Sequence, residues 1–131
     1  MASLDDAGAI ALALPDTSEG VRHGNRTWFV NGKVFAWERP FSNADIKRYG
    51  SDTPPDGPIL AVRVLDLQEK EVLLASGVKG LFTIPHFEGF SAVLIQLRSV
   101  GKRALKRCLL DAWLAIAPPA LAEEHLRGPK P

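Results

Sequence analysis

Residues 27–38 read Thr-Trp-Phe-Val-Asn-Gly-Lys-Val-Phe-Ala-Trp-Glu, and this stretch predicts a β-hairpin around which the rest of the chain is arranged. Asn31-Gly32 stands between two runs rich in aromatic and β-branched residues, which are typical of strands. Both central residues of a type I′ turn need a positive φ angle, and Asn and Gly adopt one most readily. The pattern therefore predicts a two-residue turn at Asn31-Gly32.

The two-residue turn also predicts which hairpin residues share a face. Pairing Val30 with Lys33 and continuing without interruption brings Thr27 opposite Ala36, and side chains alternate between the two faces of a strand. Both faces are then apolar enough to need cover, which indicates a central place in a sheet. One face is predicted to carry Thr27, Phe29, Val34 and Ala36, and the other Arg26, Trp28, Val30, Lys33, Phe35 and Trp37.

The face that carries most of the aromatic residues has two interpretations. Trp28, Phe35 and Trp37, with Arg26 and Lys33 beside them, form the kind of platform on which nucleic-acid bases stack. The same face can instead be a core surface that helices cover, with the cations at its rim. We favour the core, because the chain also predicts an apolar helix stripe that needs a surface to pack against, made of Leu105, Cys108, Leu109, Ala112, Trp113 and Ile116.

Helix and turn signals on both sides of the hairpin complete the predicted fold. Ser3 and Asp6 form a capping box for a first helix that Pro15 ends, and a strand over Glu19–His23 leads into the hairpin. This order predicts a single domain over residues 1–131 with an α+β fold, a two-layer sandwich of an antiparallel β-sheet with helices mainly on one face. The later elements are a short helix over Asn43–Tyr49 capped by Ser42, a strand over Ile59–Leu65, a helix from Asp66 to Ser76, strands over Leu81–Ile84 and Ser91–Leu97, and a last helix over Lys102–Ala117 that Pro118-Pro119 stops.

Composition and length indicate an ordinary globular domain. Hydrophobic residues make up 46% of the 131 residues and charged residues 24%, and the formal net charge is +1. A single cysteine, Cys108, excludes an internal disulfide and a multi-cysteine metal site. Asp5 and Asp6 interrupt the region where a secretory signal would begin, and no apolar run reaches membrane-spanning length. We therefore expect a cytoplasmic protein with no membrane partner.

The sequence carries no motif typical of an enzyme or a metal site. His23, His86 and His125 are scattered, with no second ligand three or four residues away on a helix, and phosphate-cradling glycine loops and the nucleophile elbow are absent. We therefore expect a non-enzymatic protein with no catalytic residue, no metal and no cofactor. His86 lies in a loop between two strands, where it either shapes the loop or lines a ligand pocket with Trp37 and the turn-rich segment 39–58.

Basic residues concentrate toward the C-terminus. From Arg98 onward, seven basic and three acidic residues give a net charge of +4, which leaves −3 for the preceding part. Four of these cations lie opposite the apolar stripe of the last helix, and two occupy its first turn, where each opposes the helix macrodipole by about 0.3–1 kcal/mol. The cluster is either a solvated helix face or a surface that contacts phosphates. It consists of Lys102, Arg103, Lys106 and Arg107.

Several ordered stretches resemble the MmcQ/YjbR family. They are Leu14-Pro15 with Glu19-Gly20, the hairpin from Gly24 to Trp37, Thr83-Ile84-Pro85-His86-Phe87-Glu88-Gly89-Phe90, and Asp111-Ala112-Trp113-Leu114-Ala115-Ile116-Ala117-Pro118. Trp37-Glu38-Arg39-Pro40, Asp45-Ile46 and residues 57–63 resemble an actinobacterial-type branch of that family. The likeness runs from about Leu4 to Leu126 and implies one MmcQ/YjbR-like domain. It also implies a YjbR-type α+β fold, frataxin-like in outline, and a DNA-binding function.

Taken together, the residues and the resemblance predict a non-enzymatic DNA-binding protein. The phosphate contacts are expected from cations of the hairpin and the last helix, namely Arg26, Lys33, Lys102, Arg103, Lys106 and Arg107. The alternative is a small-ligand or protein-interaction module whose pocket lies near Trp37, His86 and segment 39–58.

Overall fold

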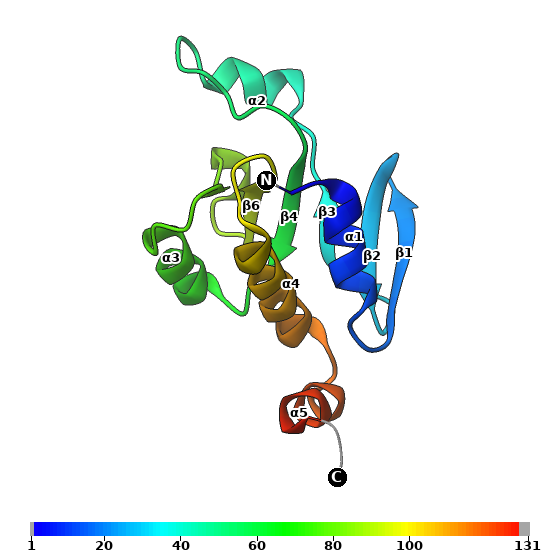
Figure 1. Ribbon diagram of the computed structural model, residues 1–131. Coiled ribbons are helices and arrows are strands. Elements are labelled where there is room, and N and C mark those ends of the chain that lie inside the picture. The colour runs from blue at the N-terminus through cyan, green and yellow to red at the C-terminus, as the bar shows by residue number, and fades with distance from the viewer. Residues whose placement is uncertain (1, 129–131) are drawn as a thin grey trace.

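Six antiparallel strands form one sheet in the order β1-β2-β3-β4-β6-β5 in the computed structural model, which describes residues 2–128 (Figure 1). Each pair of neighbouring strands is antiparallel, so hairpins and longer connections build the sheet without a parallel crossover. The strands are β1 (Thr17–Arg22), β2 (Asn25–Val30), β3 (Lys33–Glu38), β4 (Ile59–Arg63), β5 (Leu81–Phe82) and β6 (Ala92–Gln96).

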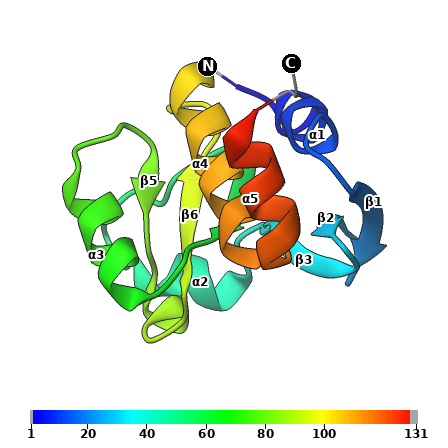
Figure 2. The same cartoon turned by 90° about the horizontal axis from the view of Figure 1, so that it is seen from below.

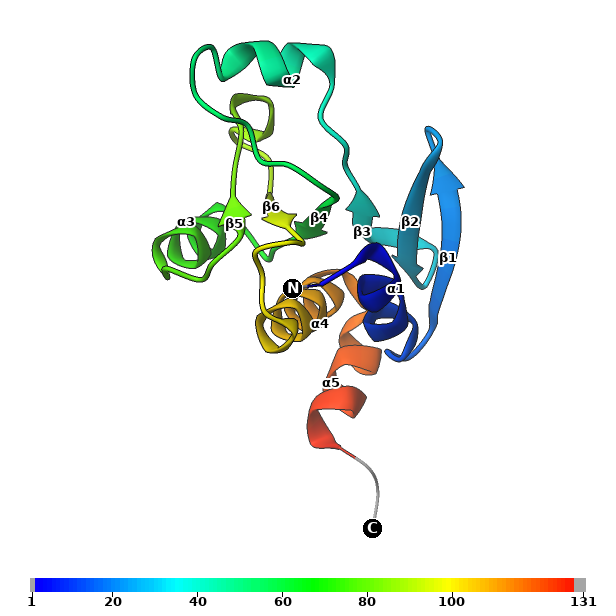
Figure 3. The ribbon, with the colours of Figure 1, turned by 45° about the horizontal axis from the view of Figure 1, so that its top comes forward.

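Helices cover mainly one face of this sheet, which confirms the predicted α+β two-layer sandwich. The helices α1 (Leu4–Leu12), α4 (Lys102–Ile116) and α5 (Pro119–Arg127) lie on the same side of the sheet (Figure 2). At the far edge, α3 (Leu67–Ala75) lies beside β5 and β6. The short helix α2 (Asn43–Arg48) belongs to the connection between β3 and β4 and projects beyond the ends of these strands (Figure 3).

The main apolar core lies between the sheet and α1 and α4. Trp28, Val30 and Phe35 from the hairpin are fully buried there, as are Leu105 and Trp113 from the predicted apolar stripe of α4. Cys108 of the same stripe is buried too, and burial raises the pKa of its thiol to about 11. The interpretation of the hairpin as core ribbon is therefore confirmed for Trp28 and Phe35.

A smaller apolar core lies on the other face of the sheet and covers only the half formed by β4, β6 and β5. Two of its residues come from the 3₁₀ turn η1 (Pro85–Phe87) and its start: Ile84 precedes the turn and Phe87 is its last residue. The strands contribute Ile59, Ala61, Ala92 and Leu94. Within residues 2–128, neither core includes Phe29 or Val34, which pair across β2 and β3. We call this side of β1, β2 and β3 the open face, and it carries Gly20, Arg22, Thr27, Phe29, Val34 and Trp37.

The predicted hairpin register is right for the first two pairs from the turn, Val30 with Lys33 and Phe29 with Val34, and wrong beyond them. Asn31 has φ 50° and Gly32 φ 77°, as a type I′ turn requires, and Val30 pairs with Lys33 as predicted. Trp28 then pairs with Ala36 rather than Phe35, because a β-bulge inserts one extra residue into β3. The extra residue reverses the alternation, so Ala36 faces the main core and Trp37 moves to the open face beside Thr27.

The ends of the helices are set by local caps that the sequence predicted. Ser3 and Asp6 form the capping box of α1, with bonds of 2.9 and 3.1 Å, and Ser42 and Asp45 form that of α2. The prediction that the last helix is followed by no further one is wrong. α4 ends at Ile116, before Pro118-Pro119, and Pro119 then begins α5, since a proline at the first helical position loses no hydrogen bond.

Candidate functional site

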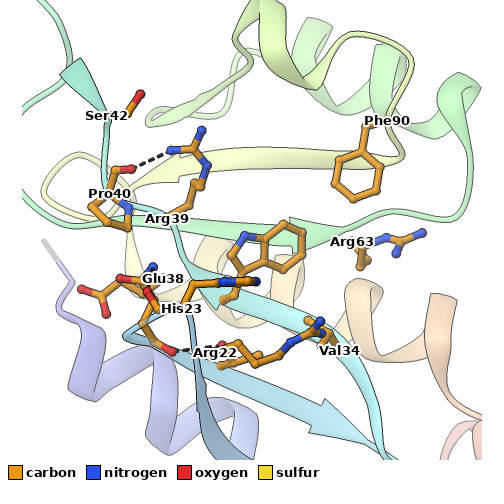
Figure 4. A pocket seen from close by; sticks show the side chains of 12 residues that line it. Arg22, His23, Val34, Glu38, Arg39, Pro40, Ser42, Arg63 and Phe90 are labelled. Carbon is orange, nitrogen blue, oxygen red and sulfur yellow. Dashed lines mark hydrogen bonds between the residues drawn. The ribbon is translucent and has the colours of Figure 1, made fainter. Parts of the chain in front are cut away.

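A cavity of about 550 Å³ lies on the open face of the sheet, which is within the size range of small-molecule sites. Its walls come from the β1–β2 turn, the end of β3 with the segment that follows it, the end of β4, and the loop before β6 (Figure 4). The β1–β2 turn is a second tight turn, with His23 at φ 54° and Gly24 at φ 77°. It brings Arg22 and His23 to the rim of the cavity.

Trp37 is the aromatic centre of the cavity. Its ring is half-buried and lies 6.3 Å from the ring of Phe87 and 6.2 Å from that of Phe90, which also lines the cavity. Thr27, its neighbour on β2, is only 2% exposed. The bulge in β3 is the reason that Trp37 lies here, because uninterrupted alternation would have pointed this side chain into the main core.

Three arginines from different elements surround the cavity, and Figure 4 shows Arg22, Arg39 and Arg63 on different sides of it. Arg63 donates from Nε to the carbonyl oxygen of Ser91 at 3.1 Å and lies over the ring of Phe90 at 5.1 Å. Glu38 is the acidic residue among the described lining residues, so their formal net charge is +2. Such a site favours an anion that also carries an apolar or aromatic group.

Asp45 holds one of these arginines in place from α2. Its carboxylate is 3% exposed and accepts hydrogen bonds from Arg39 Nη1 and Arg48 Nη1, both at 3.0 Å, and from the backbone N–H of Ser42 at 2.9 Å. Burial alone would raise the pKa of Asp45, but the bonds from Ser42 and the Arg39 guanidinium outweigh it and lower the pKa below its ordinary value. One carboxylate between two arginines leaves this cluster net positive.

The acid stability of the protein is expected to depend on Asp45. Because its pKa is lower in the folded than in the unfolded chain, its contribution is complete above the unfolded value of about 3.9 and is lost as the pH falls through the folded value. Asp45→Asn should lower the free energy of unfolding at pH 7 by about 2 kcal/mol, since two arginines lose a charged acceptor. Urea titrations at a series of pH values between 7 and 3 measure this, and the variant should show a flatter profile than the wild type.

Lys70 of α3 fixes the aromatic wall of the cavity from behind. Only 6% exposed, it donates from Nζ to the carbonyl oxygens of Phe87 at 2.7 Å and Phe90 at 2.8 Å. Burial lowers the pKa of Lys70, and the charge of Glu88 acts in the opposite direction. The two bonds tie the loop that carries Phe87 and Phe90 to α3, so both rings have a defined place beside Trp37.

The structure places the six cations predicted to contact phosphates on the helix-covered side of the sheet, away from the cavity. Arg26 is held there by Asp5 at 2.9 Å and by both carboxylate oxygens of Glu19 at 3.0 and 3.1 Å, and it lies 5.3 Å over the ring of Trp28. The hydrogen bond to Arg26 and a second one from Trp28 lower the pKa of Glu19. A phosphate would have to compete with two carboxylates for Arg26.

The other five predicted cations are exposed. Lys33 pairs with the buried Val30 and so leaves the hairpin on the helix-covered side. Lys102 lies 3.9 Å from Asp6. The helix cations at the solvent side of α4 are Lys102, Arg103, Lys106 and Arg107, and the last of these is paired with Asp111 at 3.2 Å.

The pocket predicted around Trp37, His86 and segment 39–58 is brought together only in part. Trp37 and Arg39 line the cavity, but His86 is exposed in η1 and is not among the described residues that line it. Arg22, Arg63 and Phe90 line the cavity and were not singled out from the sequence as site residues. Arg22 and Arg63 are each the last residue of a strand, and a charged side chain at a strand end is typical of a partly exposed sheet face. This is the sequence signal that points to them.

Residues 2–128 contain neither a metal-binding cluster nor a membrane-spanning helix. Among residues 2–128, His, Cys, Asp and Glu side chains do not gather in any group of three that could hold a metal ion. Over the same residues, every helix is too short or too polar to cross a membrane.

Three mycobacterial proteins are similar to this chain along almost its whole length. Uncharacterized protein Rv2570 and Uncharacterized protein MT2646, both of Mycobacterium tuberculosis, and Uncharacterized protein Mb2600 of Mycobacterium bovis are each 40% identical over 129 residues. The match covers 96% of this chain and 97% of each relative. No protein-family model matches the chain, and no solved structure matches it significantly. The chain therefore belongs to the family of these mycobacterial proteins.

Proposed function

We propose that the protein binds single-stranded nucleic acid, DNA in the first instance, through the cavity on its open face. The observation that carries the proposal is an accessible indole, Trp37, within a ring of three arginines. A nucleotide combines the two groups that such a site attracts, because its base stacks on an aromatic ring and its phosphate bonds to guanidinium groups. Arg22 and Arg63 supply the phosphate contacts, and Arg39 is partly neutralised by Asp45.

The position of the ring favours single strands over duplexes. Trp37 is half-buried and lines a concave site, whereas the bases of a duplex are stacked on one another and show only their edges in the grooves. A base must therefore leave its stack to reach the indole, which an unpaired strand does at little cost. The resemblance to the MmcQ/YjbR family supports DNA as the class of ligand. We also propose the cytoplasmic location that the sequence predicts.

The chemistry of the lining favours binding over catalysis. Ser42 already accepts a hydrogen bond at Oγ from the backbone of Asp45, and Glu38 accepts one from the backbone of Arg26. Neither bond belongs to a nucleophile–base pair of the kind that activates a hydroxyl. A small anionic ligand with an aromatic ring is the second candidate, because the cavity volume suits one.

Salt dependence tests the proposal directly. Titration of a fluorescently labelled oligothymidylate of twelve nucleotides should give binding whose affinity falls with salt, with a log–log slope of roughly −1.4 for two phosphate contacts on a single strand. A duplex of the same length should compete weakly. Binding that is independent of salt, or a preference for the duplex, would contradict the proposal.

A matched pair of variants assigns the binding face. Arg22→Ala with Arg63→Ala removes two positive charges from the cavity, and Lys102→Ala with Arg103→Ala removes two from the helix-covered side. We expect the first pair to weaken binding at least tenfold and to reduce the salt slope by about 1.4, while the second pair leaves both within about twofold. The reverse result would place the phosphate contacts on α4.

A further inference from the structure

We infer that the open face holds a second base-stacking position, formed by Phe29 over Gly20, so that the protein takes two nucleotides of one single strand rather than an isolated nucleotide. This inference rests on the proposed function and extends the cavity around Trp37. It concerns an aromatic ring that lies outside both apolar cores in the part of the chain that the structure describes.

The ring of Phe29 lies on the backbone of the edge strand. A Cβ atom built on Gly20 would be 3.1 Å from Cε1 and 3.8 Å from Cζ of Phe29, so the ring rests where a side chain of β1 would otherwise stand. Gly20 is not among the glycines with positive φ, and its backbone conformation alone would admit another residue. Glycine at this position thus makes room for the ring of Phe29, which is half-buried.

The two rings flank one row of residues across the sheet. Gly20 pairs with Thr27, and Thr27 pairs with Trp37, so Phe29 covers one end of this row and Trp37 is the other. Neighbouring strands are about 4.8 Å apart, which puts the two ends of the row about 10 Å apart. Thr27 lies between them and is 2% exposed, so neighbouring side chains cover this position of the row.

The surface between the rings suits the backbone of a nucleic-acid strand. Val34 pairs with Phe29 and also lines the cavity, so the floor is continuous from one ring to the other. Arg22 lies on the same face of β1, two residues from Gly20, and also lines the cavity. Among residues 2–128, Arg22 takes part in no ion pair, so its guanidinium is available to the phosphate that links the two nucleotides.

Ligands of different chain length distinguish the stacking position at Trp37 from the one at Phe29. We propose titrations with thymidine 5′-monophosphate, which fills one position, and with a tetrathymidylate, which spans both. Phe29→Leu keeps an apolar side chain but removes the ring face, and it should weaken tetrathymidylate binding about tenfold while leaving the mononucleotide within twofold. Phe82→Leu is the matched control, because Phe82 is a partly buried aromatic residue of β5 on the covered half of the sheet, and it should change neither affinity.

The titrations distinguish a failure of the second stacking position from a failure of the proposed function. If Phe29→Leu binds tetrathymidylate like the wild type while Trp37→Leu weakens both probes, the second position is wrong and the cavity function stands. If neither probe binds the wild-type protein, the proposed function fails and the second position with it. Gly20→Ala provides a second variant that keeps the ring but displaces it by a few tenths of an ångström, and it should weaken only the tetrathymidylate.

Discussion

Replacing Trp28 with Ala is expected to lower the free energy of unfolding by about 3–5 kcal/mol, the largest stability effect of any substitution in the hairpin. Trp28 is fully buried, and its indole N–H donates to Glu19 Oε1 at 2.9 Å. The truncation therefore leaves a cavity between β2 and α1 and removes a bond from a carboxylate that also holds Arg26. Urea unfolding followed by far-UV circular dichroism measures the loss.

The matched control is Trp37→Ala on the neighbouring strand. Trp37 is half-buried at the edge of the smaller core, and its indole donates no hydrogen bond within residues 2–128, so its loss should cost less than about 1.5 kcal/mol. Equal losses for the two variants would contradict the bulge, because they would mean that both indoles belong to one core. Since uninterrupted alternation predicts the same face for both, this comparison tests the β3 bulge in solution.

The bulge marks the limit of what the hairpin sequence predicts. The Asn31-Gly32 turn is local, since it follows from the φ angles that two residues adopt, and it was predicted correctly. Phe35 and Ala36 both face the main core, and both residue types also occur in regular strands, so neither one signals a bulge. What selects the bulge is the packing of Phe35 and Trp28 under α4 and α1, and these contacts join distant parts of the chain.

The difference between local signals and contacts of distant segments also explains which residues of the candidate site the sequence predicts. The basic cluster of α4 is visible in the sequence because helical spacing groups its members, yet the spacing does not tell which layer of the fold the helix faces. Arg22, Arg39 and Arg63 belong to three separate elements and meet only because β1, β3 and β4 are brought into one sheet. Trp37 was the one residue of the cavity that the sequence associated with both a stacking platform and a pocket.

Trp37→Ala is expected to weaken the binding of single-stranded DNA by 1–3 kcal/mol, which corresponds to roughly a 5- to 150-fold rise in Kd. Phe90 is the other aromatic ring among the described lining residues, and the Arg63 guanidinium lies over it at 5.1 Å, so it replaces the indole only in part. Trp37→Phe should recover part of the affinity, because a smaller ring still offers a stacking face. Anisotropy titrations of the three proteins at one salt concentration give the ranking.

Intrinsic fluorescence gives an independent measure of the same contact. The three tryptophans of the chain are Trp28, Trp37 and Trp113, and both Trp28 and Trp113 are fully buried on the helix-covered side. A base that stacks in the cavity therefore quenches the emission of Trp37 alone, and the quenching should vanish in Trp37→Phe while binding persists. Quenching that survives in this variant would show that the bound strand acts on the main core through a change of structure, and it would contradict stacking on Trp37.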